Sequence, residues 1–440
     1  MTKRPSAPVV LKFGGASLAR PAAIVDRVRA MRRARTPVVL VVSAREGVTD
    51  ELRRLIDEPR AVRRHREGLA RIAAQHPELS AIGRAHLAGL HRLLGSVERA
   101  GRIDLQTSDR ILSMGERLAV DWLIVRLRNA DLPAVGVEAD HLGLTTDDHY
   151  GAANVLIDRS TAPVRAGILP LLRRGKIPVV TGFFGRSVDG RVATLGRGGS
   201  DYSATAIAAI LGAERVELVK RGVSVLTADP RLVPAARPIR RLSYEEAEEL
   251  AQFGAKVLHP LTIEPARTAG VEIAVRSLDD PREVTTIGPP RGPGRMRAVA
   301  LLEPLGLVRI RVPGGRQRPG VVADVSRRLA DARVNIVTLF TSSTLLSVVV
   351  ERAKGRAAAR ALAPLSTGGG AAVDGPFPVG LLTAIGEGVL HDLGRIPAGV
   401  LAHGEGLSAT PRSLSFAVPI PKARAALRAL HRALVEEAGR

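Results

Sequence analysis

The sequence predicts an α/β fold in which a mostly parallel sheet is sandwiched by helices, followed by a smaller α+β region. Short apolar runs alternate with alanine-rich helical stretches up to about residue 286, as in βα units that cover both faces of a sheet. Residues 287–294 are then rich in proline and glycine, which disfavour both helix and strand. Beyond them, residues 308–312 alternate apolar and polar as a half-buried strand does. The change of pattern indicates at least two domains in the 440-residue chain.

The expected strands of the large sheet are short and strongly apolar. They lie at residues 9–11, 38–42, 134–137, 178–181, 216–219 and 272–275. Between residues 50 and 112 the pattern is long, charged and helical, without a clear strand. We therefore expect a helical excursion from the sheet in this part of the chain.

The region after the linker predicts two similar units. A strand at 308–312, a helix at 320–332 and strands at 334–339 and 345–350 form a βαββ start. A glycine-rich gap at 366–370 precedes a weaker second set at 379–385, 389–401, 414–418 and 421–437. The expected domain bounds are 1–287, a linker at 288–297, then 298–366 and 371–440.

Composition excludes several classes of function. With no cysteine, the chain has no disulfides, thiolate metal sites or cysteine nucleophiles. The formal charge is +22, but only 2% of the residues are aromatic, and the arginines are spread along expected helices. We therefore expect a solvated basic surface and no nucleic-acid partner. No apolar run is long enough to span a membrane and no signal segment is evident, so we expect a cytoplasmic protein without a membrane partner.

A glycine-rich stretch at residues 194–201, TLGRGGSD, follows a strand-turn-strand pattern and opens an alanine-rich helix. Glycines let backbone N–H groups approach a ligand, and a helix N-terminus adds unpaired N–H groups and the positive end of a dipole. The stretch is thus a candidate anion site. The alternative is a plain glycine turn with Ser200 or Asp201 as the N-cap of the helix.

A second glycine pair lies at residues 12–17, KFGGAS, where an apolar run ends and a helical pattern follows. Lys12 beside the turn would offer a phosphate both a point charge and backbone amides. The spacing matches neither a Walker loop nor the GxGxxG fingerprint, and a lone lysine at a strand end is more often a solvated edge residue. Two such loops, each at a strand-to-helix junction, are what a phosphoryl-transfer site requires.

With four further motifs, these loops make nearly the whole chain resemble the aspartate kinases of the amino-acid-kinase superfamily. The motifs occur in the family's order, at 12–17 (KFGGAS), 42–44 with 47–49 (VSA, GVT), 113–118 (SMGERL), 194–201 (TLGRGGSD), 227–231 (TADPR) and 254–260 (GAKVLHP). The resemblance implies transfer of the γ-phosphate of ATP to the β-carboxylate of aspartate, with ATP and Mg²⁺ as cofactors. The product would be 4-phospho-L-aspartate, the first step of lysine, threonine and methionine biosynthesis.

The resemblance also implies an amino-acid-kinase-like catalytic domain followed by ferredoxin-like ACT units. Such units imply an amino-acid effector besides the substrate aspartate, and assembly into a homodimer or higher homo-oligomer. A cytoplasmic location agrees with this family.

Each matched residue acquires an implied role. Lys12 and Asp201 would be catalytic, with Lys12 neutralising charge on the moving phosphoryl group and Asp201 organising that lysine or hydrated Mg²⁺. Arg197 would fork onto the α-carboxylate of aspartate and Glu116 would bind its α-amino group. The other substrate-binding residues are Ser43, Thr49 and Ser200. The nucleotide-binding residues are Lys12, Gly14, Gly15, Ser17, Lys220, Arg221, Arg231 and Lys256. No side chain is assigned as a metal ligand.

The chain departs from the family pattern at residues 220–224, KRGVS, where aspartate kinases usually have threonine-aspartate-valine-aspartate-glycine. Both acidic residues of that nucleotide loop are missing. The change indicates new phosphate contacts from Lys220 and Arg221, weak ATP binding, or a retired active site. Ala16 replaces a threonine, and Arg45 and Glu46 replace small or neutral residues.

Two alternatives therefore stay open. One is an amino-acid kinase that acts on a different carboxylic acid, favoured if Arg45 and Glu46 line the substrate pocket. The other is a degenerate regulatory paralogue that binds an amino acid through its ACT region. Retention of the five convergent charges argues against complete retirement. They are Lys12, Glu116, Arg197, Asp201 and Lys256.

Overall fold

The computed structural model describes residues 7–57, 62–221, 225–253, 258–280, 282–290, 297–311, 320–369, 371–402 and 404–437. The chain divides into two compact units. The first comprises Met1–Val225, Arg240–Tyr244 and Val257–Pro290. The second comprises Leu226–Ile239, Glu245–Lys256 and Arg291–Arg440. The domain bounds expected from the sequence do not describe this interleaving, and as limits of independently folding domains they stay a prediction.

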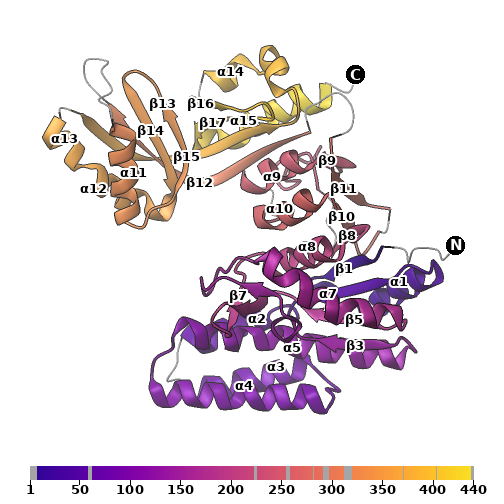
Figure 1. Ribbon diagram of the computed structural model, residues 1–440. Helices are drawn as coiled ribbons and strands as arrows, with labels where there is room; N and C mark the ends of the chain where they lie inside the picture. Colours follow the sequence, from indigo (N-terminus) through magenta and orange to yellow (C-terminus); the bar gives the residue numbers. More distant parts are fainter. Residues whose placement is uncertain are drawn as a thin grey trace. The chain divides into compact units, whose positions relative to one another are not determined.

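An eight-stranded sheet forms the centre of the first unit, with strand order β3-β5-β2-β1-β8-β10-β11-β9 (Figure 1). In that order the strands span Ala134–Val137, Ile177–Thr181, Val38–Val42, Val9–Phe13, Arg215–Lys220, Glu272–Ser277, Val284–Gly288 and Arg241–Ser243. Neighbours from β3 to β10 are parallel, whereas β11 is antiparallel to β10. The expected mostly parallel sheet and its six strands are confirmed; β9 and β11 extend one edge.

The remaining elements of this unit are helices and one small sheet. The helices and 3-10 turn are η1 (Ser17–Ala19), α1 (Pro21–Arg33), α2 (Val48–Asp57), α3 (Val62–Gln75), α4 (Ala81–Ala100), α5 (Leu105–Asn129), α6 (Ala139–Leu142), α7 (Ile157–Arg173), α8 (Gly199–Leu211) and α10 (Pro260–Ala269). The small sheet has the order β4-β6-β7, at Thr145–Thr146, Phe184–Ser187 and Val192–Thr194. Helices α2 to α5 are the expected excursion.

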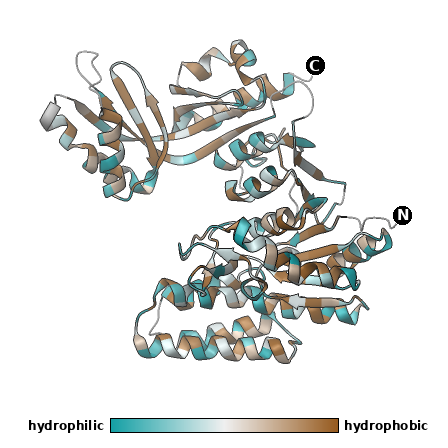
Figure 2. Ribbon diagram, in the orientation of Figure 1, coloured by the Kyte–Doolittle hydropathy of each residue, from teal (hydrophilic) through white to brown (hydrophobic). Residues whose placement is uncertain are grey.

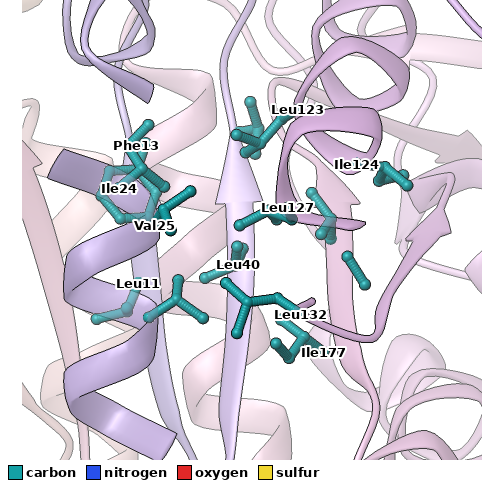
Figure 3. Close-up of a cluster of buried hydrophobic side chains, with 14 of the residues drawn as sticks. Leu11, Phe13, Ile24, Val25, Leu40, Leu123, Ile124, Leu127, Leu132 and Ile177 are labelled. Atoms are coloured by element: carbon teal, nitrogen blue, oxygen red, sulfur yellow. The ribbon is translucent and has the colours of Figure 1, made fainter. Parts of the chain in front are cut away.

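One face of the large sheet carries an apolar core against α1 and α5. Figure 3 shows Leu11 and Phe13 of β1 facing Ile24 of α1, with Leu40 of β2 facing Leu127 of α5. Successive strand residues point to opposite faces, so Lys12 points away from this core. Helix α8 contacts β1, β2 and β8. The alternation along β1 thus places a lysine among apolar neighbours but on the face of the sheet that meets α8.

The second unit contains a six-stranded antiparallel sheet with strand order β13-β14-β12-β15-β17-β16. In that order the strands span Ile336–Thr341, Leu345–Glu351, Ala298–Arg311, Ala372–Ile385, Ser413–Pro419 and Glu405–Ala409. Its helices are α9 (Tyr244–Gln252, of which Tyr244 belongs to the first unit), α11 (Val321–Asp331), η3 (Arg352–Lys354), α12 (Gly355–Leu362), α13 (Pro364–Gly369), η4 (Val389–Arg395), α14 (Ala398–Leu401), α15 (Ile420–His431) and η5 (Arg432–Glu436).

Two expectations for this region need correction. The strand expected at 308–312 is only the end of β12, which begins at Ala298. Pro304 makes the first half of β12 look unlike a strand in the sequence, and a register shift between Leu302 and Leu305 accommodates the proline in the sheet. The gap expected at 366–370 lies largely in α13, which begins at Pro364, a residue suited to the first helical position.

The segment 226–239 folds as part of the second unit. Thr227 accepts a hydrogen bond from the N–H of Val299 (2.8 Å), and its hydroxyl lies 2.9 Å from Nε2 of the buried His431. Val233 joins the apolar cluster of α15 and β17.

Figure 2 shows the strands of the two larger sheets as largely hydrophobic. In the part of the chain that the structure describes, no helix is both long enough and apolar enough to cross a membrane.

Candidate active site

Three charges from separate elements meet at the carboxyl ends of β1 and β8. Lys12 Nζ lies 2.6 Å from Oδ1 of Asp201, and Lys220 Nζ lies 3.0 Å from its Oδ2. Lys12 and Asp201 are each 7% exposed. In parallel sheets ligands bind at this edge, where neighbouring strands lead their loops in different directions. One carboxylate therefore holds two ammonium groups at the place where such a fold receives its ligand.

Asp201 reaches the lysines because it is not used as a helix cap. The N-cap of α8 is Gly198, in the left-handed region at φ 76°, and no side chain caps this helix. The N-cap alternative for Ser200 or Asp201 is therefore wrong. Burial by itself raises the pKa of Asp201, but the charges and hydrogen bonds of Lys12 and Lys220 outweigh it and hold the pKa at about 2. The carboxylate is thus ionised at neutral pH.

The first glycine loop lies against the loop after β2. A Cβ on Gly15 would come within 2.7 Å of the carbonyl oxygen of Ala44, so only glycine fits. Among the described residues, the N–H groups of Gly14 and Gly15 have no hydrogen-bond partner. These two N–H groups adjoin Lys12 in the chain and remain available to an anion.

Glu116 approaches the same loop from α5. Oε1 accepts a hydrogen bond from the N–H of Ala44 (2.9 Å), and Gly115 allows the close approach, since its Cβ would lie 2.9 Å from that of Ala44. Oε2 is buried and has no hydrogen-bond partner in the described structure. Burial raises the pKa of Glu116 to about 8, against the opposing effects of the bond from Ala44 and the charge of Lys12. A buried carboxyl with a free oxygen is suited to receive a cation.

The remaining residues expected to bind substrate lie on the loops and helix starts at this edge. Ser43 follows β2 and donates its N–H to the carbonyl of Phe13 (3.1 Å), and Thr49 lies in the first turn of α2. Ser200 is 8% exposed in the first turn of α8. Arg197 is exposed, and within the described residues its guanidinium has no hydrogen bond or ion pair. An exposed guanidinium beside a positive-φ glycine turn can move onto an incoming carboxylate.

Four other expected nucleotide contacts are engaged in other bonds, exposed, or outside the described residues. Ser17 donates its hydroxyl to the carbonyl of Val219 (3.1 Å) and its N–H to that of Gly14 (3.0 Å). A bond from Ser17 to a nucleotide would have to replace one of these. Arg231 belongs to the second unit, where it pairs with Asp229 at 2.7 Å. Arg221 is exposed, and Lys256 lies outside the described residues, as do residues 222–224 of the altered loop.

Arg45 has a packing role. Its guanidinium lies 4.0 Å from the ring centroid of Trp122, and Arg126 lies at the same distance from that ring. Trp122 is 3% exposed and belongs to the apolar core. Stacking on a core ring stabilises Arg45 by cation–π attraction. The position of Arg45 therefore gives no support to a pocket shaped for another acid.

One cluster resembles a metal site but is an ion-pair cluster. Glu138, Asp140 and His141 bring potential ligand atoms within 4.8 Å of one another. Arg117 already pairs with Glu138, and its Nη2 lies 2.7 Å from Oδ2 of Asp140. A guanidinium held among these ligands opposes a further cation.

Sequence reasoning missed two residues that hold the glycine-rich stretch. Asp109, 1% exposed on α5, accepts hydrogen bonds from Thr194 and Gly151. His259, at the start of α10, packs so closely on Gly198 that a Cβ there would lie 2.7 Å from that of His259. Asp109 lies in none of the matched motifs, and His259 lies in the motif at 254–260 without an assigned role, because each acts through partners distant in the sequence.

Comparison with known proteins relates the whole arrangement to one family. The model of the amino acid kinase family matches residues 7–277. The aspartokinase of Thermus thermophilus is 31% identical over 340 residues, which cover 74% of this chain and 82% of that protein. Escherichia coli aspartokinase III in complex with aspartate and ADP, in its R-state, has a TM-score of 0.80 at 27% identity, over 97% of this chain and 99% of its own. The same enzyme with lysine and aspartate, in its T-state, has a TM-score of 0.78 at 27% identity over the same shares.

Proposed function

The chain belongs to the amino acid kinase family as an aspartate kinase, and from this premise we propose which residues carry out the reaction. The γ-phosphoryl group of ATP passes to the β-carboxylate of aspartate. The observation that carries the proposal is the pairing of Asp201 with both Lys12 and Lys220. Phosphoryl transfer needs positive charge at the moving group more than it needs covalent chemistry, and two fixed ammonium groups supply that charge.

Aspartate is held by its α-groups. The α-ammonium group donates a hydrogen bond to the free Oε2 of Glu116, which would otherwise stay buried without a partner. The α-carboxylate pairs with the guanidinium of Arg197. Ser43, Thr49 and Ser200 orient the molecule from the surrounding loops. The β-carboxylate is thereby directed toward the lysine pair. This division of labour is supported by the burial of Glu116 and the free guanidinium of Arg197.

ATP is held chiefly by its phosphates. The N–H groups of Gly14 and Gly15 and the ammonium groups of Lys12 and Lys220 face them, with Arg221 and Lys256 adding charge. Asp201 keeps the two lysines together in the absence of ligand. Mg²⁺ would supply charge neutralisation on the phosphates, and Asp201, which is already engaged by two lysines, would hold those lysines rather than the ion.

The second unit is regulatory. Its antiparallel sheet with two long central strands supports the assignment of a pair of ACT units, and the E. coli relative crystallised with lysine supports an amino-acid effector. The chain forms a homodimer or higher homo-oligomer through this unit. Its reaction is the first step toward lysine, threonine and methionine.

A hydroxamate assay for the acyl phosphate, with ATP, Mg²⁺ and aspartate, tests the assignment. We expect aspartate-dependent hydroxamate from the unmodified chain and none from Lys12→Ala, which would still bind aspartate. The unmodified chain should turn over aspartate in preference to glutamate. No product, together with no nucleotide binding, would instead establish the degenerate regulatory paralogue. Turnover of another acid in preference to aspartate would establish the different amino-acid kinase.

A further inference from the structure

Asp109 joins three segments around the glycine-rich stretch. Its Oδ2 accepts hydrogen bonds from the N–H of Gly151 (2.9 Å) and of Thr194 (2.8 Å), and its Oδ1 accepts one from the hydroxyl of Thr194 (2.8 Å). Thr194 is the residue at which the stretch begins. Asp109 is 1% exposed, so without these three bonds its carboxylate would be buried and unpaired, which is energetically unfavourable. Such charge-assisted bonds are stronger than neutral ones.

The segment around Gly151 is fastened to the same stretch at further points. The N–H of Ala153 donates to the carbonyl of Thr194 (2.9 Å). At Gly196, with φ 69°, a Cβ would lie 3.1 Å from the carbonyl oxygen of Gly151. Arg197 follows directly. The backbone that carries Arg197 is therefore held between the carboxylate of Asp109 and the segment that Asp109 also holds.

Asp109 lies on the same helix as Glu116. Both belong to α5, seven residues apart, which is two turns along one face and about 10 Å of helix. Glu116 is fixed to the loop after β2 through Ala44, whereas Asp109 is fixed to the stretch before Arg197. One rigid helix thus connects the carboxylate that receives the amino group of aspartate with the backbone that carries its carboxylate partner.

We propose that Asp109 is a positioning residue for aspartate, which sets the spacing between Glu116 and Arg197 by tying the glycine-rich stretch to α5. The inference rests on the proposed roles of those two residues. Asp109 itself touches neither substrate nor nucleotide. Its loss displaces Arg197 relative to Glu116 and leaves the lysine pair at β1 and β8 in place, since Lys12 and Lys220 are held by Asp201.

The test uses the full chain and three substitutions. Asp109→Ala removes all three acceptors. Asp109→Asn keeps one oxygen for the two backbone N–H groups and offers its amide to the hydroxyl of Thr194, which can accept. Thr194→Val removes only the hydroxyl bond. As a matched control, Asp104→Ala removes the N-cap of the same helix, which accepts from the N–H of Thr107 at 2.6 Å without touching the stretch.

We expect Asp109→Ala to raise KM and the calorimetric Kd for aspartate about 10- to 100-fold, the range that small misplacements of a binding group produce, with KM for ATP within twofold. Asp109→Asn should restore KM for aspartate to within about threefold, and Thr194→Val should raise it about two- to fivefold. Asp104→Ala should lower Tm and leave both KM values unchanged.

An Asp109→Ala protein whose aspartate KM lies within twofold of the unmodified chain would overturn the inference and leave the proposed function intact. If Asp109→Ala does not fold, an unchanged aspartate KM in Thr194→Val would overturn it. Equal increases in the KM of aspartate and ATP would also overturn it, because they indicate general loosening. Failure of the unmodified chain to bind aspartate would overturn the proposed function and this inference together.

Discussion

Lys220 lies 3.0 Å from the carboxylate of Asp201, which is also the counterion of Lys12. The side chain of Lys220 is 22% exposed, which shields it from salt more than the exposed Arg221 that follows it. The residue that replaces the family's threonine is therefore built into the charged centre. This position makes a phosphate-binding role for Lys220 testable apart from that of Arg221.

Lys220→Met should raise KM for ATP about 10- to 100-fold, because a hydrogen bond to a charged group contributes about 1.5–3 kcal/mol. KM for aspartate should change little. Arg221→Ala should instead reduce the dependence of ATP affinity on salt. Initial rates and equilibrium binding across a salt series measure both effects, with the exposed Lys176→Met as the control. A Lys220→Met protein with unaltered ATP affinity would remove Lys220 from the nucleotide site.

Glu116 should couple aspartate binding to proton release. Its pKa of about 8 leaves it mainly protonated in the free protein at pH 7. The bound ammonium group favours the charged form and lowers that pKa, so a proton leaves on binding and affinity rises as pH increases toward 8. Calorimetry in buffers of different ionisation enthalpy should show close to one proton released at pH 7. Glu116→Gln should abolish this release; proton release that survives the substitution would point to another group.

Arg197→Ala should abolish the use of aspartate while nucleotide binding persists. Removing one partner of a charge pair that the bound substrate covers costs about 2–5 kcal/mol. Aspartate saturation curves and ADP titrations separate the two effects. Arg191→Ala, an exposed arginine on the turn before the glycine-rich stretch, is the matched control. Normal aspartate saturation in Arg197→Ala would exclude the proposed carboxylate contact.

Asp201 should stabilise the first unit in a pH-dependent way. Its pKa lies at about 2, below the ordinary 3.8, so its contribution is complete above about pH 4 and is lost as pH falls toward 2. A shift of this size corresponds to about 2 kcal/mol. Urea unfolding followed by fluorescence of Trp122, the single tryptophan, should show Asp201→Asn destabilised at pH 7 and the difference shrinking toward pH 2. A difference that stays constant with pH would contradict this account.

Much of the first unit could be predicted because its central strands are buried on both faces. Runs such as Val38–Val42 are apolar throughout, which is typical of a central strand covered on both faces. The edge strand β9 has only three residues, two polar and one apolar, so its sequence does not indicate a strand. Pro304 interrupts the strand pattern of β12, so the first half of that strand could not be recognised.

The site was predictable only where chemistry and local pattern coincide. The two glycine loops indicated an anion site, and the family resemblance implied that Asp201 organises Lys12 or hydrated Mg²⁺. The contact of Lys220 with Asp201 and the hydrogen bonds of Asp109 depend on how distant segments pack. The partners of Asp109 are 42 and 85 residues away, beyond the reach of any periodicity.

The interleaving of the two units makes the chain resistant to modular dissection. The backbone crosses between them at 225/226, 239/240, 244/245, 256/257 and 290/291. A fragment cut after Pro290 would keep the segment 226–239 and lose the helix and strands that bury Val233 and hold Thr227. Such a fragment would therefore carry a segment of the second unit, 226–239, without the partners that bury it. Gene fusions and domain exchanges in this chain should therefore be made with both units kept whole.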